Sequence, residues 1–149
     1  MMTIYSRKLR VSFDQAVSKV TEALARRGFG VITTIDVKSV FKQKLNLDFR
    51  NYTILGACNP DFAYKAISIE SHMGVMLPCN VVVQQHESGE IEISAINPLE
   101  TIDRVQAAPS LNELAMEVTS RLRAALDDLR KDFRETIETQ ALPEPELVN

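Results

Sequence analysis

Helical and strand-like spacings of apolar residues alternate along the first part of the chain. Residues 5–11 form a short basic run typical of a strand, and apolar residues then recur at helical spacing over residues 13–24. Ser12 and Gln15 make a capping box that predicts where this helix begins, and Gly28 predicts where it ends. The pattern therefore predicts a strand followed by a helix with one buried stripe.

The next segments repeat this alternation, with a polar residue at each helix start. Residues 30–35 are rich in β-branched side chains and predict a second strand, and Asp36 is placed to cap a short helix after it. Residues 52–55 predict a third strand. Asn59 and Pro60 predict the start of another helix, because asparagine caps free amides and proline has no amide that needs a partner.

Two apolar runs in the second half of the chain predict a β-hairpin. Residues 81–86 and 91–96 flank the turn-forming segment Glu87-Ser88-Gly89-Glu90. In the second run, apolar residues alternate with Glu92 and Ser94. This alternation predicts one buried and one solvated face.

A long amphipathic helix is predicted near the C-terminus. Ser110 and Glu113 form a second capping box, and apolar residues follow in steps of four and three as far as Ile137. A helix from Leu111 to about Thr139 would be about 40 Å long, close to the diameter of a compact domain of this size. Its seam-like stripe predicts a dimer interface. The alternative is that the stripe covers the chain's own sheet, and both uses are compatible along different parts of the helix.

These elements together predict an α+β fold built on a single curved sheet. The sheet is expected to have about five mostly antiparallel strands, with helices packed on one face and the long helix last. The predicted order is one strand, one helix, four strands with short helices between them, and the closing helix. Residues 1–138 are expected to form one domain, and residues 139–149, which include two prolines, a disordered tail.

Composition and charge exclude several classes of protein. The chain is 45% hydrophobic and 25% charged, as in ordinary soluble proteins, and no apolar run approaches the roughly 20 residues of a membrane span. The N-terminus has no segment of signal-peptide type, so we expect a cytoplasmic protein with reduced thiols. A net charge of −3 and a basic N-terminal third without interleaved aromatic residues argue against a nucleic-acid partner.

The candidate chemistry centres on the two cysteines. Cys58 precedes Asn59 and Pro60 at a predicted junction between strand and helix, and Cys79, followed by Asn80, enters a predicted strand. A helix N-terminus lowers the pKa of a thiol, and two thiols whose Cα atoms lie within about 7 Å could form a reversible redox pair. The alternative is that both are small buried residues at tight turns, since free cysteine is among the most buried residue types.

Other candidate groups have simpler explanations. His72 and His86 would complete a set of four ligands with the cysteines, but the spacing matches no zinc motif, so we expect neither a metal nor a cofactor. Asp36 is explained as a helix cap, and Tyr64 as a half-buried ring. Each could instead face a pocket.

Several segments taken together resemble the domain-of-unknown-function family 302. They are residues 28–31 with 34–38, residues 49–60, Ala63-Tyr64 and residues 77–83, and the resemblance extends over roughly residues 5 to 130. It implies a TATA-binding-protein-like α+β fold and a homodimer, and it carries no established activity. The family's recurring positions correspond here to Asp36, Cys58, Asn59, Pro60, Tyr64, Cys79 and Asn80, and no catalytic role can be transferred to any of them.

We therefore expect a homodimeric module that binds a small ligand or a partner in a pocket near the turn Ala57-Cys58-Asn59-Pro60. The candidate ligand-binding residues are Asp36, Cys58, Asn59, Tyr64, Cys79 and Asn80. The alternative is a thiol-based redox or sulfur-handling enzyme that uses Cys58 and Cys79. Both hypotheses require the two cysteine segments to border a common hollow. We expect no membrane or nucleic-acid partner.

Overall fold

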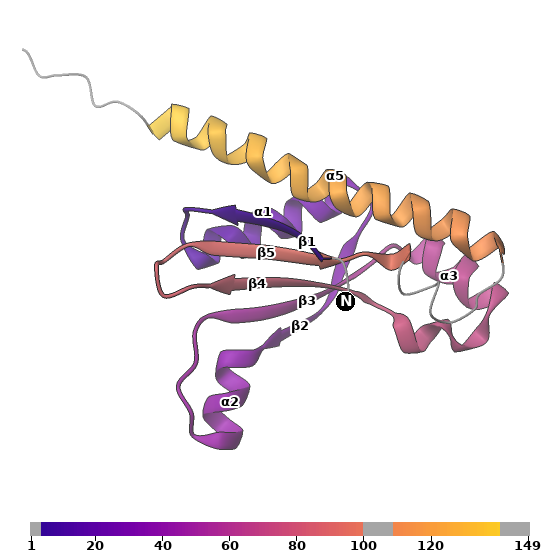
Figure 1. Cartoon of the computed structure of the whole chain (residues 1–149), viewed down its shortest axis with the longest axis horizontal. Helices are drawn as coiled ribbons and strands as arrows, with labels where there is room; N and C mark the ends of the chain where they lie inside the picture. Colours follow the sequence, from indigo (N-terminus) through magenta and orange to yellow (C-terminus); the bar gives the residue numbers. More distant parts are fainter. Residues whose placement is uncertain (1–3, 100–108, 141–149) are drawn as a thin grey trace, which may run out of the picture.

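The computed structural model describes residues 4–99 and 109–140, and describes side chains in the last helix as far as Leu129. The predicted α+β fold is confirmed (Figure 1). The strands are β1 (Ile4–Leu9), β2 (Gly30–Asp36), β3 (Tyr52–Cys58), β4 (Cys79–Gln85) and β5 (Ile91–Ile96). The helices are α1 (Phe13–Arg26), α2 (Val37–Leu45), α3 (Pro60–Ile69), the 3₁₀ helix η1 (Ser71–Met76) and α5 (Pro109–Gln140).

The five strands form one antiparallel sheet in the order β1-β5-β4-β3-β2. The predicted hairpin is its centre, because β4 and β5 pair directly and have a further strand on each side. β1 and β2 are therefore the two edges. From β2 to β5, each strand pairs antiparallel with the next strand in the sequence. The one connection that crosses the sheet is therefore the one from β1 through α1 to β2, which lie at opposite edges.

The core lies between one face of the sheet and the helices α1 and α5. Buried residues alternate along β5, where Ile91, Ile93 and Ala95 face the core while Glu92 and Ser94 lie on the opposite face, as predicted. The core combines three groups of fully buried side chains. From the sheet come Leu55, Val81, Val83, Ile91 and Ile93, from α1 Ala16, Val20, Ala23 and Leu24, and from α5 Leu122, Ala125, Leu126 and Leu129.

Side-chain caps begin α1, α2 and α3 where the sequence predicts, whereas α5 already begins at Pro109, so Ser110 lies inside the helix and not at the predicted cap. Ser12 and Gln15 form the full capping box of α1, and Asp36 accepts a hydrogen bond from the amide of Ser39 at the start of α2. Gly28 has φ of 87°, a left-handed conformation that lets the chain turn from α1 into β2. These local devices set the ends of the elements that surround the site.

The stripe of α5 is buried within the same chain. Leu111, Ala115, Leu122, Leu126 and Leu129 are each no more than 2% exposed. Of the two uses predicted for this stripe, the structure therefore shows the covering of the chain's own core, at least as far as Leu129. The tail predicted after residue 138 lies, from residue 141 onward, outside the described residues.

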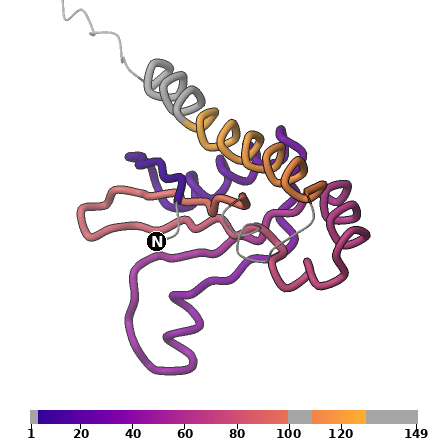
Figure 2. The backbone as a smooth tube through the Cα atoms, turned by 45° about the vertical axis from the view of Figure 1, so that its right-hand side comes forward, coloured from indigo at the N-terminus to yellow at the C-terminus, as the bar shows by residue number. Residues whose placement is uncertain are grey.

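A second projection of the backbone shows an arm that leaves the body of the protein (Figure 2). It consists of β2, α2 and the connection to β3, and α2 lies at its far end, away from α1, α3 and α5. None of the residues of α2 is buried. The arm thus contributes little to the core described above.

Candidate functional site

A cavity of about 290 Å³ lies where β3 ends and β4 begins, enclosed by α3, η1 and the first half of α5. The two cysteines and the asparagine that follows each of them line this cavity, and most of the other lining side chains are apolar. The lining residues are Phe29, Ala57, Cys58, Asn59, Phe62, Ala63, Ala66, Met73, Val75, Met76, Leu77, Pro78, Cys79, Asn80, Ile96, Pro98, Leu111, Leu114, Ala115 and Val118. The predicted hollow bordered by both cysteine segments is present.

Asn59 builds the wall that α3 contributes. Its side-chain oxygen accepts a hydrogen bond from the amide of Phe62 at 3.2 Å, and Pro60 occupies the first helical turn. This start directs Phe62 and Ala66, both buried, toward the cavity. A Cβ atom on Gly28 would lie 2.8 Å from the side-chain nitrogen Nδ2 of Asn59, so glycine at this turn leaves room for the capping side chain.

Gly56 makes a second close approach that shapes the site. A Cβ atom here would overlap the hydroxyl of Thr33 on β2 and would lie 2.7 Å from Pro78. The missing side chain therefore allows the segment before Cys79 to cross closely over β3. The sequence analysis assigned Gly56 no role, because only the register between β2, β3 and β4 brings these three residues together.

The two cysteines are free thiols, and both are half-buried. The strand register pairs Cys79 with Ala57 and Cys58 with Gly30, so the thiols do not face each other across a ladder position. Burial raises the pKa of Cys79 to about 11, and the charge that Cys58 can carry acts in the same direction. Cys79 is therefore a neutral thiol at physiological pH.

The other predicted site residues divide into two groups. Asn59 and Asn80 line the cavity. Asp36 does not, because it pairs with Thr53 at the opposite end of the β2–β3 ladder from Cys58. Its role as a cap holds its pKa below the ordinary value, through the Ser39 amide first and the Ser39 hydroxyl second. Tyr64 is 76% exposed rather than half-buried, and it is not among the residues that line the cavity.

Most of the lining was missed by the sequence reasoning. Met73, Val75 and Met76 come from η1, which was not predicted from the sequence, and Leu111 and Leu114 come from the start of α5. Their apolar character was visible in the sequence, but an apolar pattern does not reveal that two buried faces leave a space between them. No aspartate, glutamate, lysine, arginine or histidine lines the cavity among the residues that the structure describes.

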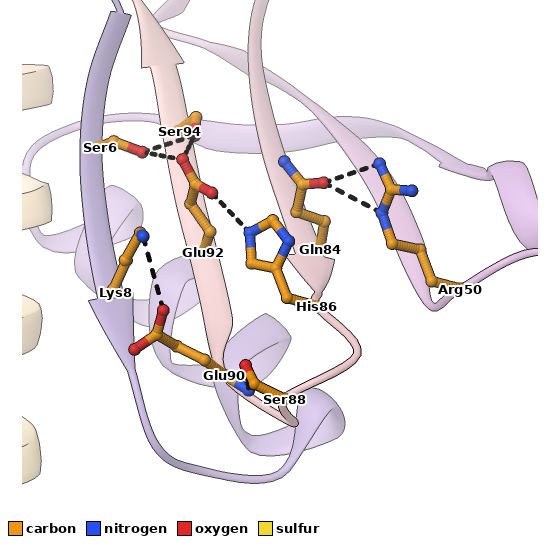
Figure 3. A network of polar contacts seen from close by, with 9 residues as sticks. All are labelled: Ser6, Lys8, Arg50, Gln84, His86, Ser88, Glu90, Glu92 and Ser94. Carbon is orange, nitrogen blue, oxygen red and sulfur yellow. Dashed lines mark hydrogen bonds and ion pairs between the residues drawn. The ribbon is translucent and has the colours of Figure 1, made fainter.

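A polar cluster on the opposite face of the sheet is separate from this cavity (Figure 3). Glu92 accepts a hydrogen bond from Ser6 at 2.7 Å and pairs with His86 at 2.6 Å, while Ser94 lies 2.8 Å from Ser6. The Ser6 hydroxyl and then His86 lower the pKa of Glu92. The cluster joins β1, β5 and the first residue after β4, and we assign it a structural role.

The histidines do not join the cysteines in a ligand set. His72 contacts Glu70 at 2.7 Å, and His86 belongs to the polar cluster. In residues 4–99 and 109–129, no three histidine, cysteine, aspartate or glutamate side chains gather as metal ligands. Neither does any helix in the described part of the chain have the length and apolarity of a membrane span.

The fold defines a class of small α+β domains in which one antiparallel sheet is backed by two helices. Within that class, the chain belongs to the family described as "Domain of unknown function DUF302", whose sequence profile matches residues 5–129. It is similar to the crystal structure of an uncharacterized conserved protein DUF302 from Bacillus stearothermophilus. The two chains are 30% identical with a TM-score of 0.79, over 87% of this chain and 100% of that one. A comparison of the chain with curated proteins found no match.

Proposed function

We propose that this protein is a binding module that takes a small, uncharged and largely apolar molecule into the cavity beside the Ala57-Cys58-Asn59-Pro60 turn. The observation that carries the proposal is the lining, which is apolar apart from two asparagines and two thiols among the described residues. An ionic ligand would leave its charge without a partner in such a site, at a cost of several kcal/mol.

The size of the cavity supports a compact ligand. Its volume of about 290 Å³ is at the lower end of known small-molecule sites, which span roughly 300–1,000 Å³. Burial of about 200 Å² of apolar ligand surface would contribute about 5 kcal/mol before the cost of association. We therefore expect affinities between micromolar and millimolar, with the polar groups of Asn59 and Asn80 orienting the ligand.

A neutral fluorescent probe tests the proposal. N-phenyl-1-naphthylamine is apolar, uncharged and compact, and its emission rises when it leaves water. We expect saturable binding of one probe per chain to the wild-type protein. The variant Ala63→Phe fills the cavity from α3 and is expected to weaken binding at least tenfold. Ala25→Phe is the matched control, because Ala25 is an exposed helical alanine outside the lining.

Two results would overturn this reasoning. One is the absence of saturable binding to a folded wild-type protein. The other is equal binding by Ala63→Phe and wild type, which would place the probe elsewhere on the surface. Circular dichroism of each variant establishes that the fold is retained, so that loss of binding in Ala63→Phe reports on the cavity.

The thiol-based redox or sulfur-handling alternative has less support. Both thiols line the cavity, as that function requires. However, the thiolate is the reactive form of cysteine, and burial favours the neutral form of Cys79. A resolving cysteine with a pKa of about 11 would attack slowly at neutral pH. The homodimer predicted from the sequence stays a prediction, and its interface is the subject of the next inference.

A further inference from the structure

The edge strand β2 has no cover in the described part of the chain. It pairs with β3 on one side and is the last strand of the sheet on the other. Only Val31 of its seven residues is even partly buried, and Ile32 and Ile35 are 62% and 47% exposed. An exposed edge of this length, rich in β-branched residues, is a template for another strand, so soluble proteins normally block it with charges, prolines or a covering element.

The opposite edge is protected by charges, whereas the one irregularity of β2 is a β-bulge between Val31 and Thr33, which leaves residues 33–36 as its regular stretch. β1 carries Arg7 and Lys8, and α5 contacts it through an ion pair between Arg7 and Asp127. β2 carries no charge from Gly30 to Ile35 and contains no proline. Its one charged residue is Asp36 at the end, which is engaged as the cap of α2.

Helix α2 and the residues after it add further exposed aliphatic side chains to the arm. Val40 and Leu45 are 42% and 60% exposed, and Leu47 just after the helix is 56% exposed. With Ile32 and Ile35, we call these five residues the arm surface. Aliphatic side chains about half exposed leave on the order of 450 Å² of apolar area in total. That is more than half of the roughly 800 Å² per partner in a standard protein interface.

We propose that a second copy of this chain covers the arm surface, with the two β2 strands paired antiparallel across a two-fold axis. Symmetric pairing brings like residues near each other, so an edge that carries charges would repel its own copy. β1, with Arg7 and Lys8, would do so, whereas the neutral β2 would not. The pairing would join two five-stranded sheets into one of ten strands and would satisfy the free backbone groups of both edges.

The row of side chains across the open face supports a self-complementary edge. The register aligns Ile35 on β2 with Ile54 on β3 and then with Val82 on β4. This apolar row ends at the edge, where Ile35 is exposed. A second copy related by a two-fold axis would continue it with another apolar row rather than with polar groups.

Antiparallel pairing would also bring the partner toward the cavity. Gly30 and Cys58 lie at one end of the β2–β3 ladder, and α2 follows from the other end. Because the paired strands run in opposite directions, the partner's α2 would lie at the end that holds Gly30 and Cys58. The proposal does not depend on ligand binding, and its test measures mass rather than affinity for a probe.

The test compares two lysine substitutions at equally exposed positions. Ile32 is 62% exposed on β2, and Met116 is 61% exposed on α5. Sedimentation equilibrium of wild type at micromolar concentration should give twice the chain mass of 16.7 kDa. Ile32→Lys should raise the dimer dissociation constant at least about 100-fold, because like charges across an interface cost several kcal/mol. Met116→Lys should leave it unchanged.

Amide hydrogen exchange gives an independent readout that needs no variant. In wild type, the amides of Gly30–Asp36 should become more protected as protein concentration rises, while those of β1 stay constant. A monomeric wild type would overturn the proposal. So would a dimer that survives in folded Ile32→Lys, exchange in β2 that does not depend on concentration, or a dimer that Met116→Lys dissociates and Ile32→Lys does not.

Discussion

The thiol of Cys79 should react far more slowly in the folded protein than in the unfolded chain. Its pKa is raised from an ordinary 9.0 to about 11, chiefly by burial. At pH 8, a thiol with a pKa of 9.0 is about 10% thiolate and one with a pKa of 11 about 0.1%. Since alkylation proceeds through the thiolate, the rate should fall about 100-fold on folding.

The assay follows the alkylation of each cysteine separately. Native protein is treated with iodoacetamide at pH 8, samples are quenched over time, and the peptides that contain Cys58 and Cys79 are quantified by mass spectrometry. The reference is the same Cys79 peptide in protein unfolded by urea, so the chemistry of the neighbouring residues is matched. Repeating the native reaction between pH 8 and pH 10 separates ionisation from access, because ionisation makes the rate rise about tenfold per pH unit.

The same shift predicts a pH dependence of stability with a definite sign. A raised pKa in the folded state means that the contribution of Cys79 is complete below pH 9.0 and is lost as the pH rises toward 11. The loss should be about 2 kcal/mol in the free energy of unfolding, and it should be absent from Cys79→Ala. Urea unfolding at several alkaline pH values measures the difference between the two proteins.

Alkylation of native Cys79 at pH 8 within about threefold of the unfolded rate would refute this reasoning. It would mean that the thiol is exposed and ionised, and the redox alternative would gain support. A slow rate that does not increase with pH would also contradict the argument, because access rather than charge would then limit the reaction.

Three further predictions concern the frame of the site. Gly56→Ala should destabilise the protein by about 1–3 kcal/mol in urea unfolding, because the new methyl group overlaps the Thr33 hydroxyl, and adding Thr33→Ala should restore part of the loss. Leu126→Ala, at a position 1% exposed, should cost about 2–5 kcal/mol in the same assay, and a cost below about 1 kcal/mol would contradict the packing described for α5. The pKa of Glu92 is lowered, so its contribution to stability is present above the ordinary value of 4.5 and is lost as the pH falls through the folded-state pKa. Glu92→Gln should therefore weaken the loss of stability in acid, measured by urea unfolding at several acid pH values, and identical acid profiles of the two proteins would refute the assignment.

Local chemistry explains why so much of the fold could be predicted. Ser12 and Asn59 cap helices through bonds that reach only three residues ahead, so a few neighbouring letters contain all the necessary information. The hairpin of β4 and β5 is similar, since its alternation and its turn lie within one short stretch. The family resemblance then pointed to the order of the elements, and the structure confirms it.

The candidate site was predicted only in part. The cysteine segments and their asparagines do border one cavity, because the pairing of β3 with β4 places Cys79 opposite Ala57. Asp36 was predicted as a site residue but does not line the cavity. It lies at the far end of the seven-residue strand β2 from Gly30, which pairs with Cys58. Tyr64 lies on α3, the helix that borders the cavity, but its side chain faces solvent.

By itself, the sequence determined which segments are helices and strands, where most of them begin, and which side of each is apolar. It did so because capping bonds and hydrophobic periodicity act over a few residues. Only the tertiary structure decided what covers each apolar side: α5 turns its stripe onto its own core, η1 and α3 leave a cavity beside it, and β2 stays uncovered at an edge. The physical reason is that the hydrophobic effect has no direction. An apolar face must be removed from water, but its pattern does not specify whether a helix, a ligand or a second copy will do so.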